Sequence, residues 1–363
     1  MPPDSSIVEK ELLQAVANEA SEVRTSLIDI PVYADSSLVA SLWQKAIRRG
    51  HVDWAVSAAI ELQRRDPDYV WRRIRVIALE EVSVVDPALV AQILAISGKR
   101  VLRARLGERQ LLAYLTRELA LSRKCRTPCD IASWLEPMGK GMEVQGPPAR
   151  IRDLAEGNLE MVRRSAIVWR DAVPLSMRVD GRWTSSGKGS RHRREKFLDW
   201  VEAPPLLRFI VERGNSTYAL NALCVPTAQL QALHSEPRVQ SDPLPCSEEL
   251  IRGIPAYAYC MYSAPGREAL RLFVKNTKWA DDERIRIRKE ALNVLGNLIF
   301  YVEGDYCADM LEVTYGTEIE GESERTLLGR LGIQPQDIPS LMESARKSLS
   351  LLNSMRKIVA AMR

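Results

Sequence analysis

Three carboxylates toward the C-terminus have a spacing that could bind a metal ion. Asp305, Asp309 and Glu312 occupy positions i, i+4 and i+7, so they would share one face if their segment is a helix. Such a face can hold Mg²⁺, with water completing the octahedron, as metal-dependent nucleic-acid hydrolases require. No His or Lys elsewhere is identifiable as a general base, so an acidic face for a basic partner or a neighbouring subunit is the preferred interpretation. We expect no bound metal ion and no other cofactor.

A basic segment indicates a different chemistry, the binding of phosphate groups. Residues 180–194 read DGRWTSSGKGSRHRR, a polar, glycine-containing stretch that is predicted to be a mobile loop. Lys and Arg side chains neutralise backbone phosphates, and an interleaved aromatic ring can stack on an exposed base. The alternative is a solvated, flexible surface. The candidate nucleic-acid-binding residues are Arg182, Trp183, Lys188, Arg191, Arg193, Arg194 and Lys196.

The other chemistry-bearing residues do not form a complete catalytic motif. The three histidines are too few and too far apart for a metal triad or a Ser-His-Asp set. The nearest approach to a phosphate-binding loop, between Gly181 and Gly189, has five intervening residues where the motif needs four, and a glycine where it needs Ser or Thr. Cys125 and Cys129 are the one close pair of thiols, and no further zinc ligands accompany them. The sequence therefore predicts neither an ATPase nor a zinc site.

The composition is typical of a soluble globular protein. The chain has 363 residues, of which 46% are hydrophobic and 27% charged, and a net charge of +4. No run approaches the ~18 to 20 apolar residues that span a bilayer, and no secretory signal is visible. We therefore predict a cytoplasmic protein with no membrane partner. Nine basic residues fall between positions 99 and 126, and eight carboxylates without any Lys or Arg between 303 and 324, which favours a charged partner or self-association.

Helical periodicity dominates the chain, and the predicted fold class is mainly α. Start signals at Asp35, at Asp66-Pro67 and at Asp86-Pro87, with a C-terminal glycine at Gly50, indicate a multi-helix stack with short connections. A few short strands fit the second half, where 206–211 and 256–262 show alternation. A stretch rich in Gly, Met and Pro at 137–148 suggests two domains, a helical collar-like domain at 1–136 and a second, mainly helical domain at 149–363. Further helices are predicted at about 7–28, 88–96, 108–121, 130–135, 266–275, 282–302 and 336–362.

Residues 42–87 carry the most informative pattern. The elements are AIRRG at 46–50, DxA at 53–55, RR at 72–73 leading into IALEEV at 77–82, and DP at 86–87. In this order and spacing they resemble the C-terminal helical region of the replication-associated recombination protein A family, also called MgsA, whose members are AAA+ ATPases related to clamp loaders. The usual acidic pair of that family is Glu-Asp, where this chain has Glu80-Glu81, and its usual glycine after the valine is Ser83 here.

This resemblance covers about 46 of the 363 residues. In that family the region is the helical collar beside the ATPase, used for oligomerisation and for work at stalled replication forks. The resemblance implies a similar packing module and, more remotely, a replication setting, but not ATP hydrolysis. From the residues alone, the arginines and carboxylates are expected to pair where the helices meet. The predicted structural ion-pair cluster is Arg48, Arg49, Arg72, Arg73, Glu80 and Glu81.

The hypothesis that follows is a non-enzymatic helical binding protein associated with nucleic-acid transactions, in a replication, repair, mobile-element or defence context. The collar-like module would serve self-association or the docking of a protein partner, and the basic segments would contact nucleic acid. Two alternatives remain open. One is a metal-dependent nucleic-acid hydrolase centred on Asp305, Asp309 and Glu312, and the other is a pure protein–protein interaction scaffold.

Overall fold

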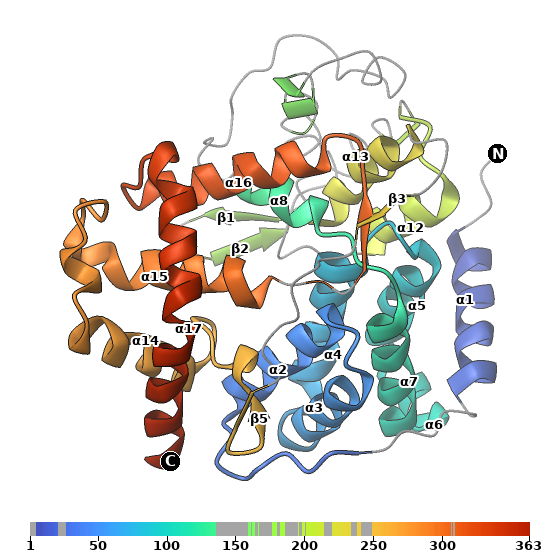
Figure 1. Cartoon of the computed structure of the whole chain (residues 1–363). Helices are drawn as coiled ribbons and strands as arrows, with labels where there is room; N and C mark the ends of the chain where they lie inside the picture. The colour runs from blue at the N-terminus through green and yellow to red at the C-terminus, as the bar shows by residue number, and fades with distance from the viewer. Residues whose placement is uncertain are drawn as a thin grey trace.

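The computed structural model is mainly α, which confirms the predicted fold class (Figure 1). It describes residues 5–20, 27–135, 159–160, 162–163, 166, 176–179, 182–185, 195, 198–199, 201–213, 220–233, 238–240, 249–305, 307 and 309–363. None of the helices in these ranges is both long and apolar enough to cross a membrane.

The N-terminal part is a stack of helices joined by short connections. A π-helix, η2, continues α4 directly and carries both Glu80 and Glu81. The elements are α1 (Ser5–Glu19), α2 (Ser36–Arg48), α3 (Val52–Arg65), α4 (Pro67–Ile77), η2 (Ala78–Val82), α5 (Pro87–Ser97), α6 (Arg100–Leu106), α7 (Glu108–Leu121) and α8 (Thr127–Leu135).

The later part adds further helices and short strands. Its helices are α12 (Pro205–Arg213), α13 (Leu220–Ala232), α14 (Ala264–Asn276), α15 (Ala291–Ile299), the π-helix η6 (Phe300–Gly304), α16 (Gly316–Arg330) and α17 (Ile338–Ala361), with 3-10 turns η3 (Ala256–Ala258), η4 (Trp279–Asp281), η5 (Arg288–Glu290) and η7 (Pro335–Asp337). Three antiparallel pairs form, β1 (Ser176–Val179) with β2 (Arg182–Ser185), β3 (Arg238–Gln240) with β6 (Met310–Glu312), and β4 (Leu250–Ile251) with β5 (Ile254–Pro255).

The predicted helix start signals are confirmed by their hydrogen bonds. The Oδ1 atoms of Asp35, Asp66 and Asp86 accept from backbone N–H groups three residues later, at 3.0, 2.8 and 2.9 Å. Gly50 follows α2 with a φ of 71°, a left-handed conformation that glycine adopts without a steric penalty. These local signals explain why the boundaries of α2 to α5 follow from the sequence.

Some segments differ from the prediction. Among the described residues the first helix is Ser5–Glu19, and residues 27 and 28, within the predicted range, are not helical. The helix expected over 282–302 begins only at Ala291, after a 3-10 turn. The alternating segment 206–211 lies in α12, because its buried residues Leu207, Ile210 and Val211 also fit the helical period. The other alternating segment, 256–262, forms η3 and turns.

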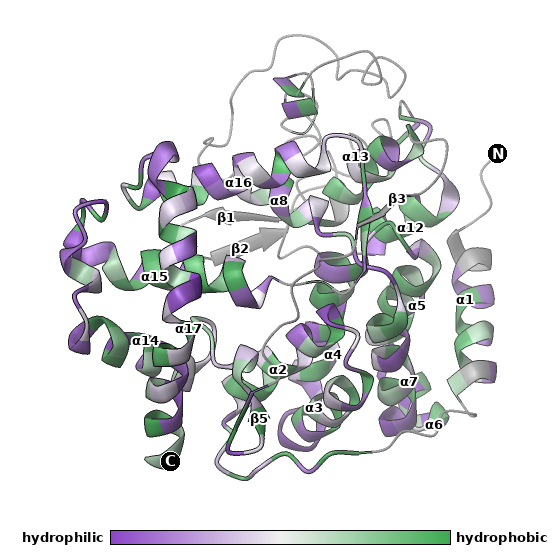
Figure 2. Ribbon diagram, viewed as in Figure 1, coloured by the Kyte–Doolittle hydropathy of each residue, from purple (hydrophilic) through white to green (hydrophobic). Residues whose placement is uncertain are grey.

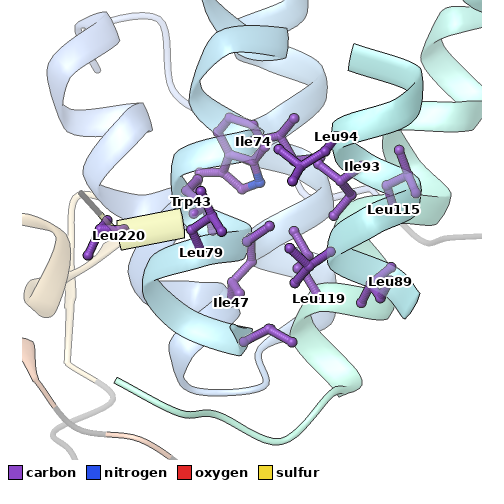
Figure 3. Close-up of a cluster of buried hydrophobic side chains, with 14 of the residues drawn as sticks. Trp43, Ile47, Ile74, Leu79, Leu89, Ile93, Leu94, Leu115, Leu119 and Leu220 are labelled. Atoms are coloured by element: carbon purple, nitrogen blue, oxygen red, sulfur yellow. The ribbon is translucent and has the colours of Figure 1, made fainter. Parts of the chain in front are cut away.

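Two hydrophobic clusters hold the described residues together. The larger one centres on Trp43 and collects apolar side chains of α1 to α8, α12 and α13. Figure 3 shows Trp43 and Ile47 of α2 among Ile74, Leu94 and Leu119 of neighbouring helices. This cluster also includes residues from 251 to 259, so it extends across the boundary predicted at 137–148.

The smaller cluster joins α14, α15 and α17 with the end of α16. Phe273, Leu295 and Leu341 are among its buried residues. Polar and apolar residues alternate along these helices in Figure 2, as expected for helices that bury one face. The space bordered by the two clusters contains the polar cavity described next.

Candidate functional site

A cavity of about 720 Å³ lies between the N-terminal helices and the C-terminal ones. Its walls come from α2, α4, η2, α8, α13, α15, η6 and α16, and from the turn after η3. We call it the polar cavity. The charged groups along its walls are Lys45, Arg48, Arg73, Glu80, Arg126, Asp130 and Asp305.

Helix α2 supplies one wall because it is polar on one side and apolar on the other. Ser37, Ser41, Lys45 and Arg48 line the cavity at spacings of three or four residues, which places them along one face of the helix. Trp43, on the opposite side, is completely buried in the larger hydrophobic cluster. The packing of one face therefore fixes the direction of the other.

Arg48 and Glu81 form a buried ion pair with two hydrogen bonds. Arg48 Nη2 lies 2.6 Å from Glu81 Oε1, and Arg48 Nε lies 2.8 Å from Oε2. Burial alone would raise the pKa of Glu81, but Arg48 and its hydrogen bonds outweigh burial and lower that pKa to about 2. The carboxylate is therefore charged at neutral pH, and the pair joins α2 to η2.

Asp305 and Arg126 extend this pair across the cavity. Asp305 Oδ1 lies 3.4 Å from Arg48 Nη1 and also pairs with Arg126 Nη1. Arg126 Nε in turn lies 4.0 Å from Glu81 Oε2. The Phe300 ring supports both arginines, since each guanidinium carbon lies 5.4 Å from the ring centroid. One charge network thus connects α2, η2, η6 and the residue before α8.

The other members of the predicted ion-pair cluster have different surroundings. Arg73 donates to Gln44 Oε1, and Gln44 Nε2 donates to Glu80 at 2.7 Å, so an amide connects this pair. Arg49 donates to the Glu303 carbonyl, and its guanidinium carbon lies 4.1 Å from the Tyr257 ring centroid. Arg72 is exposed on α4 and does not line the cavity.

Two cations on the cavity wall have no carboxylate within ion-pair distance among the described residues. Lys45 Nζ donates to the Tyr257 carbonyl at 2.7 Å, and the hydrogen bond of Arg73 goes to an amide. Burial, reinforced by Glu320 and Glu324, raises the pKa of Asp130 to about 7 despite the attraction of Arg126. Burial also raises the pKa of Glu80. Burial lowers the pKa of Lys45, while Cys260 and Glu303 work in the opposite direction. Four basic side chains therefore line the cavity, Lys45, Arg48, Arg73 and Arg126, against three carboxyl groups, Glu80, Asp130 and Asp305.

Several residues of this region were not predicted from the sequence, although one of them, Arg356, has a visible signal there. Arg356 is completely buried, and its Nη1 and Nη2 lie 3.0 and 2.7 Å from the two carboxylate oxygens of Glu303. It stands between Leu352 and Val359 on the buried stripe of α17. A basic residue inside an apolar stripe indicates a buried partner, but its identity, 53 positions away, has no local signature. Lys45, Arg126, Asp130 and Cys260 were also missed.

The carboxylates proposed as metal ligands do not share a helical face. The segment is π-helical to Gly304, and Glu312 lies on strand β6, so the condition for a shared helical face is not met. Asp305 is paired with arginines, and the Asp309 carbonyl accepts from Lys124 N at 2.9 Å. In the described part of the chain, no group of three or more His, Cys, Asp or Glu side chains is placed to hold a metal ion.

The candidate nucleic-acid-binding residues fall mostly outside the described residues. Arg182 and Trp183 belong to strand β2, paired with Val179 and Arg178, in a segment that was predicted to be a loop. Lys188, Arg191, Arg193, Arg194 and Lys196 lie outside the described residues.

Known proteins give no guide to the function of this chain. No protein-family model, no curated protein and no solved structure matches this chain.

Proposed function

We propose that this chain is a non-enzymatic helical binding protein of nucleic-acid transactions, and that the polar cavity holds a phosphate-bearing ligand, a nucleotide or the end of a single strand. The observation that carries the proposal is the pair of basic side chains on the cavity wall, Lys45 and Arg73, that have no carboxylate within ion-pair distance among the described residues, although Glu303 and Glu80 act on them from further away. A phosphate in the cavity could form direct charge-assisted hydrogen bonds with both side chains.

The size and the aromatic lining of the cavity support the same ligand class. Its volume of 720 Å³ falls within the range of about 300 to 1,000 Å³ that small-molecule sites occupy. Tyr69, Tyr262, Phe300 and Tyr301 line it as well. Aromatic rings stack on bases of any sequence, so rings beside cations suit a nucleotide better than a plain inorganic anion.

The resemblance of 42–87 to a replication-associated helical collar supports the setting. Ser83 occupies the position where that family has glycine, and its φ of 50° and ψ of −117° lie in a region that favours glycine. Self-association or docking of a protein partner through this module, contact of residues 182–196 with nucleic acid, and a cytoplasmic location are part of the proposal.

Fluorescence anisotropy with a labelled single-stranded oligonucleotide tests the proposal. Arg73→Met should weaken binding about tenfold and reduce the salt slope by about one, because one phosphate contact is lost. Arg72→Met is the matched control, since Arg72 is exposed on the same helix and does not line the cavity. It should bind as the unaltered protein does.

Two outcomes would contradict the proposal. One is the absence of binding at low salt, and the other is an equal effect of the two substitutions. Replacing Arg191, Arg193 and Arg194 with Gln separates the sites further: it should weaken binding to long oligonucleotides more than to a mononucleotide, because only the long ligand would reach both places.

A further inference from the structure

Cys260 lies in the wall of the polar cavity, and its sulfur has polar hydrogen-bond partners. The Ser41 hydroxyl lies 3.3 Å from Sγ, and the backbone N–H of Tyr262 donates to Sγ at 3.3 Å. The Lys45 ammonium also interacts with this sulfur. Donors around a sulfur favour its thiolate form, which is the nucleophilic form of cysteine.

The turn that carries Cys260 is held rigidly by the start of α14. Ser263 Oγ donates to the Cys260 carbonyl at 3.1 Å and accepts from Gly266 N at 3.2 Å, which caps the helix. A Cβ atom on Gly266 would come within 2.1 Å of the Cys260 carbonyl oxygen, so only glycine allows this approach. The position of the thiol is therefore built into the fold.

Cys260 differs from the other thiols of the described residues. Burial works to raise its pKa, but Lys45, Ser41 and the Tyr262 amide outweigh burial, and the pKa lies below the usual value for cysteine. Burial raises the pKa of Cys125 and Cys307 to about 11. It raises that of Cys224 to about 12, and that of Cys129 well above the usual value. The charged and titratable groups that surround the Cys260 site are Lys45 and Arg48 of α2, Glu80 of η2, Arg126 before α8, Glu303 of η6 and Tyr262.

The cavity gives small reagents a route to this sulfur. Cys260 as a residue is only 2% exposed, but it lines the cavity together with Tyr262, which is 60% exposed. A solvent-exposed residue and the thiol therefore line the same cavity.

We propose that Cys260 is a modification site, a thiol that small hydroperoxides entering the polar cavity oxidise to a sulfenic acid. This proposal does not depend on nucleic-acid binding. The thiolate sulfur attacks one peroxide oxygen, an S–O bond forms and the O–O bond breaks. The sulfur loses two electrons, and hydrogen peroxide is reduced. The departing hydroxide takes a proton from the Lys45 ammonium and leaves as water, and a small thiol in the medium later reduces the sulfenic acid by way of a mixed disulfide.

Treatment of the full chain with hydrogen peroxide and dimedone, followed by peptide mass spectrometry, tests the proposal. The dimedone adduct should form on the peptide of Cys260 at least tenfold faster than on those of Cys125, Cys224 and Cys307. Lys45→Met should slow it at least tenfold. Lys347→Met, an exposed lysine of α17, is the matched control and should leave the rate unchanged.

The pH dependence of alkylation in the unaltered protein gives a second readout that needs no variant. The rate of iodoacetamide labelling of Cys260 should rise to its plateau with a midpoint below pH 8.5, the ordinary value for cysteine. A midpoint at or above that value, or peroxide oxidation of Cys260 no faster than that of the other thiols, would overturn the proposal.

Discussion

The two buried carboxyl groups Glu81 and Asp130 differ in whether their partners outweigh the effect of burial on the pKa. Burial works to raise both pKa values. Glu81 receives two hydrogen bonds from Arg48, and its pKa falls to about 2. Asp130 has Arg126 nearby but also two glutamates of α16, and its pKa rises to about 7. Of these two carboxyl groups, Glu81 is therefore charged at neutral pH, whereas Asp130 titrates near neutrality.

Replacing Glu81 with Gln should destabilise the protein by about 3 kcal/mol at pH 7, because Arg48 loses its charged partner. A lowered pKa in the folded state means that the stabilisation is present above pH 4.5 and is lost as the pH falls from 4.5 toward 2. Denaturant unfolding from pH 3 to pH 7 should show the two proteins converging in acid. Glu61→Gln is the control, because Glu61 belongs to a surface ion pair of α3. It should lower the free energy of unfolding by less than about 1 kcal/mol.

The opposite pH dependence is expected for Asp130→Asn. A raised pKa in the folded state means that the contribution of Asp130 to stability is present below pH 3.8 and is lost as the pH rises through about 7. The free energy of unfolding of the variant should therefore be about 1 to 3 kcal/mol higher than that of the unaltered protein at pH 8, and equal to it at pH 3. Thermal unfolding at the two pH values measures this. A variant that is less stable at pH 8 would show that pairing with Arg126 dominates instead.

At the scale of single elements, the sequence predicted boundaries better than partners. The aspartate caps of α2, α4 and α5 depend only on residues close in the sequence, and each of these helices begins where predicted. The ion pair between Arg48 and Glu81 joins residues 33 positions apart, and the charges of neighbouring predicted helices suggested it. The hydrogen bond from Lys45 to the Tyr257 carbonyl, in contrast, spans 212 positions. No periodicity encodes a contact of that kind. The spacing of Asp305, Asp309 and Glu312 would place them on one face only in a helix. Glu312 instead belongs to β6, which pairs with β3, a strand far away in the sequence.

Replacing two helical glycines with alanine should change the stability of the protein in opposite directions. Gly266→Ala in α14 should destabilise the protein by about 1 to 3 kcal/mol or more, since its Cβ would meet the Cys260 backbone at 2.1 and 2.4 Å. A Cβ atom added at Gly329 in α16 would have no other atom within 4 Å. Gly329→Ala should therefore stabilise the protein by up to about 1 kcal/mol, because alanine has the higher helix propensity. Midpoints of denaturant unfolding compare them. Equal effects would mean that the turn before α14 can shift at little cost.

At the scale of the whole molecule, the described residues do not separate where the composition changes. The larger hydrophobic cluster contains Trp43 and Leu119 from the first part of the chain, but also Phe209 and Tyr257 from the second. A stretch rich in Gly, Met and Pro marks a change in local structure, whereas the extent of a core depends on long-range packing. This is why a boundary predicted from composition is the least secure part of a sequence interpretation.

A fragment of residues 1–136 should therefore be less stable than the whole chain. It lacks the Tyr257 carbonyl that accepts from Lys45, and Asp305, the partner of Arg48 and Arg126. We expect its thermal midpoint, followed by circular dichroism, to fall by more than about 10 °C or its transition to lose cooperativity. A midpoint within a few degrees of that of the whole chain would show that the first 136 residues are an independent domain.

Helix α2 has almost no side that faces water, since ten of its 13 residues are buried. Substitutions accumulate most readily at solvated positions, where they change stability little. This helix should therefore drift more slowly in evolution than its neighbours. Distant relatives would be recognised by two interleaved patterns in one helix: bulky apolar residues at the positions of Trp43 and Ile47, and serine, lysine and arginine at those of Ser41, Lys45 and Arg48.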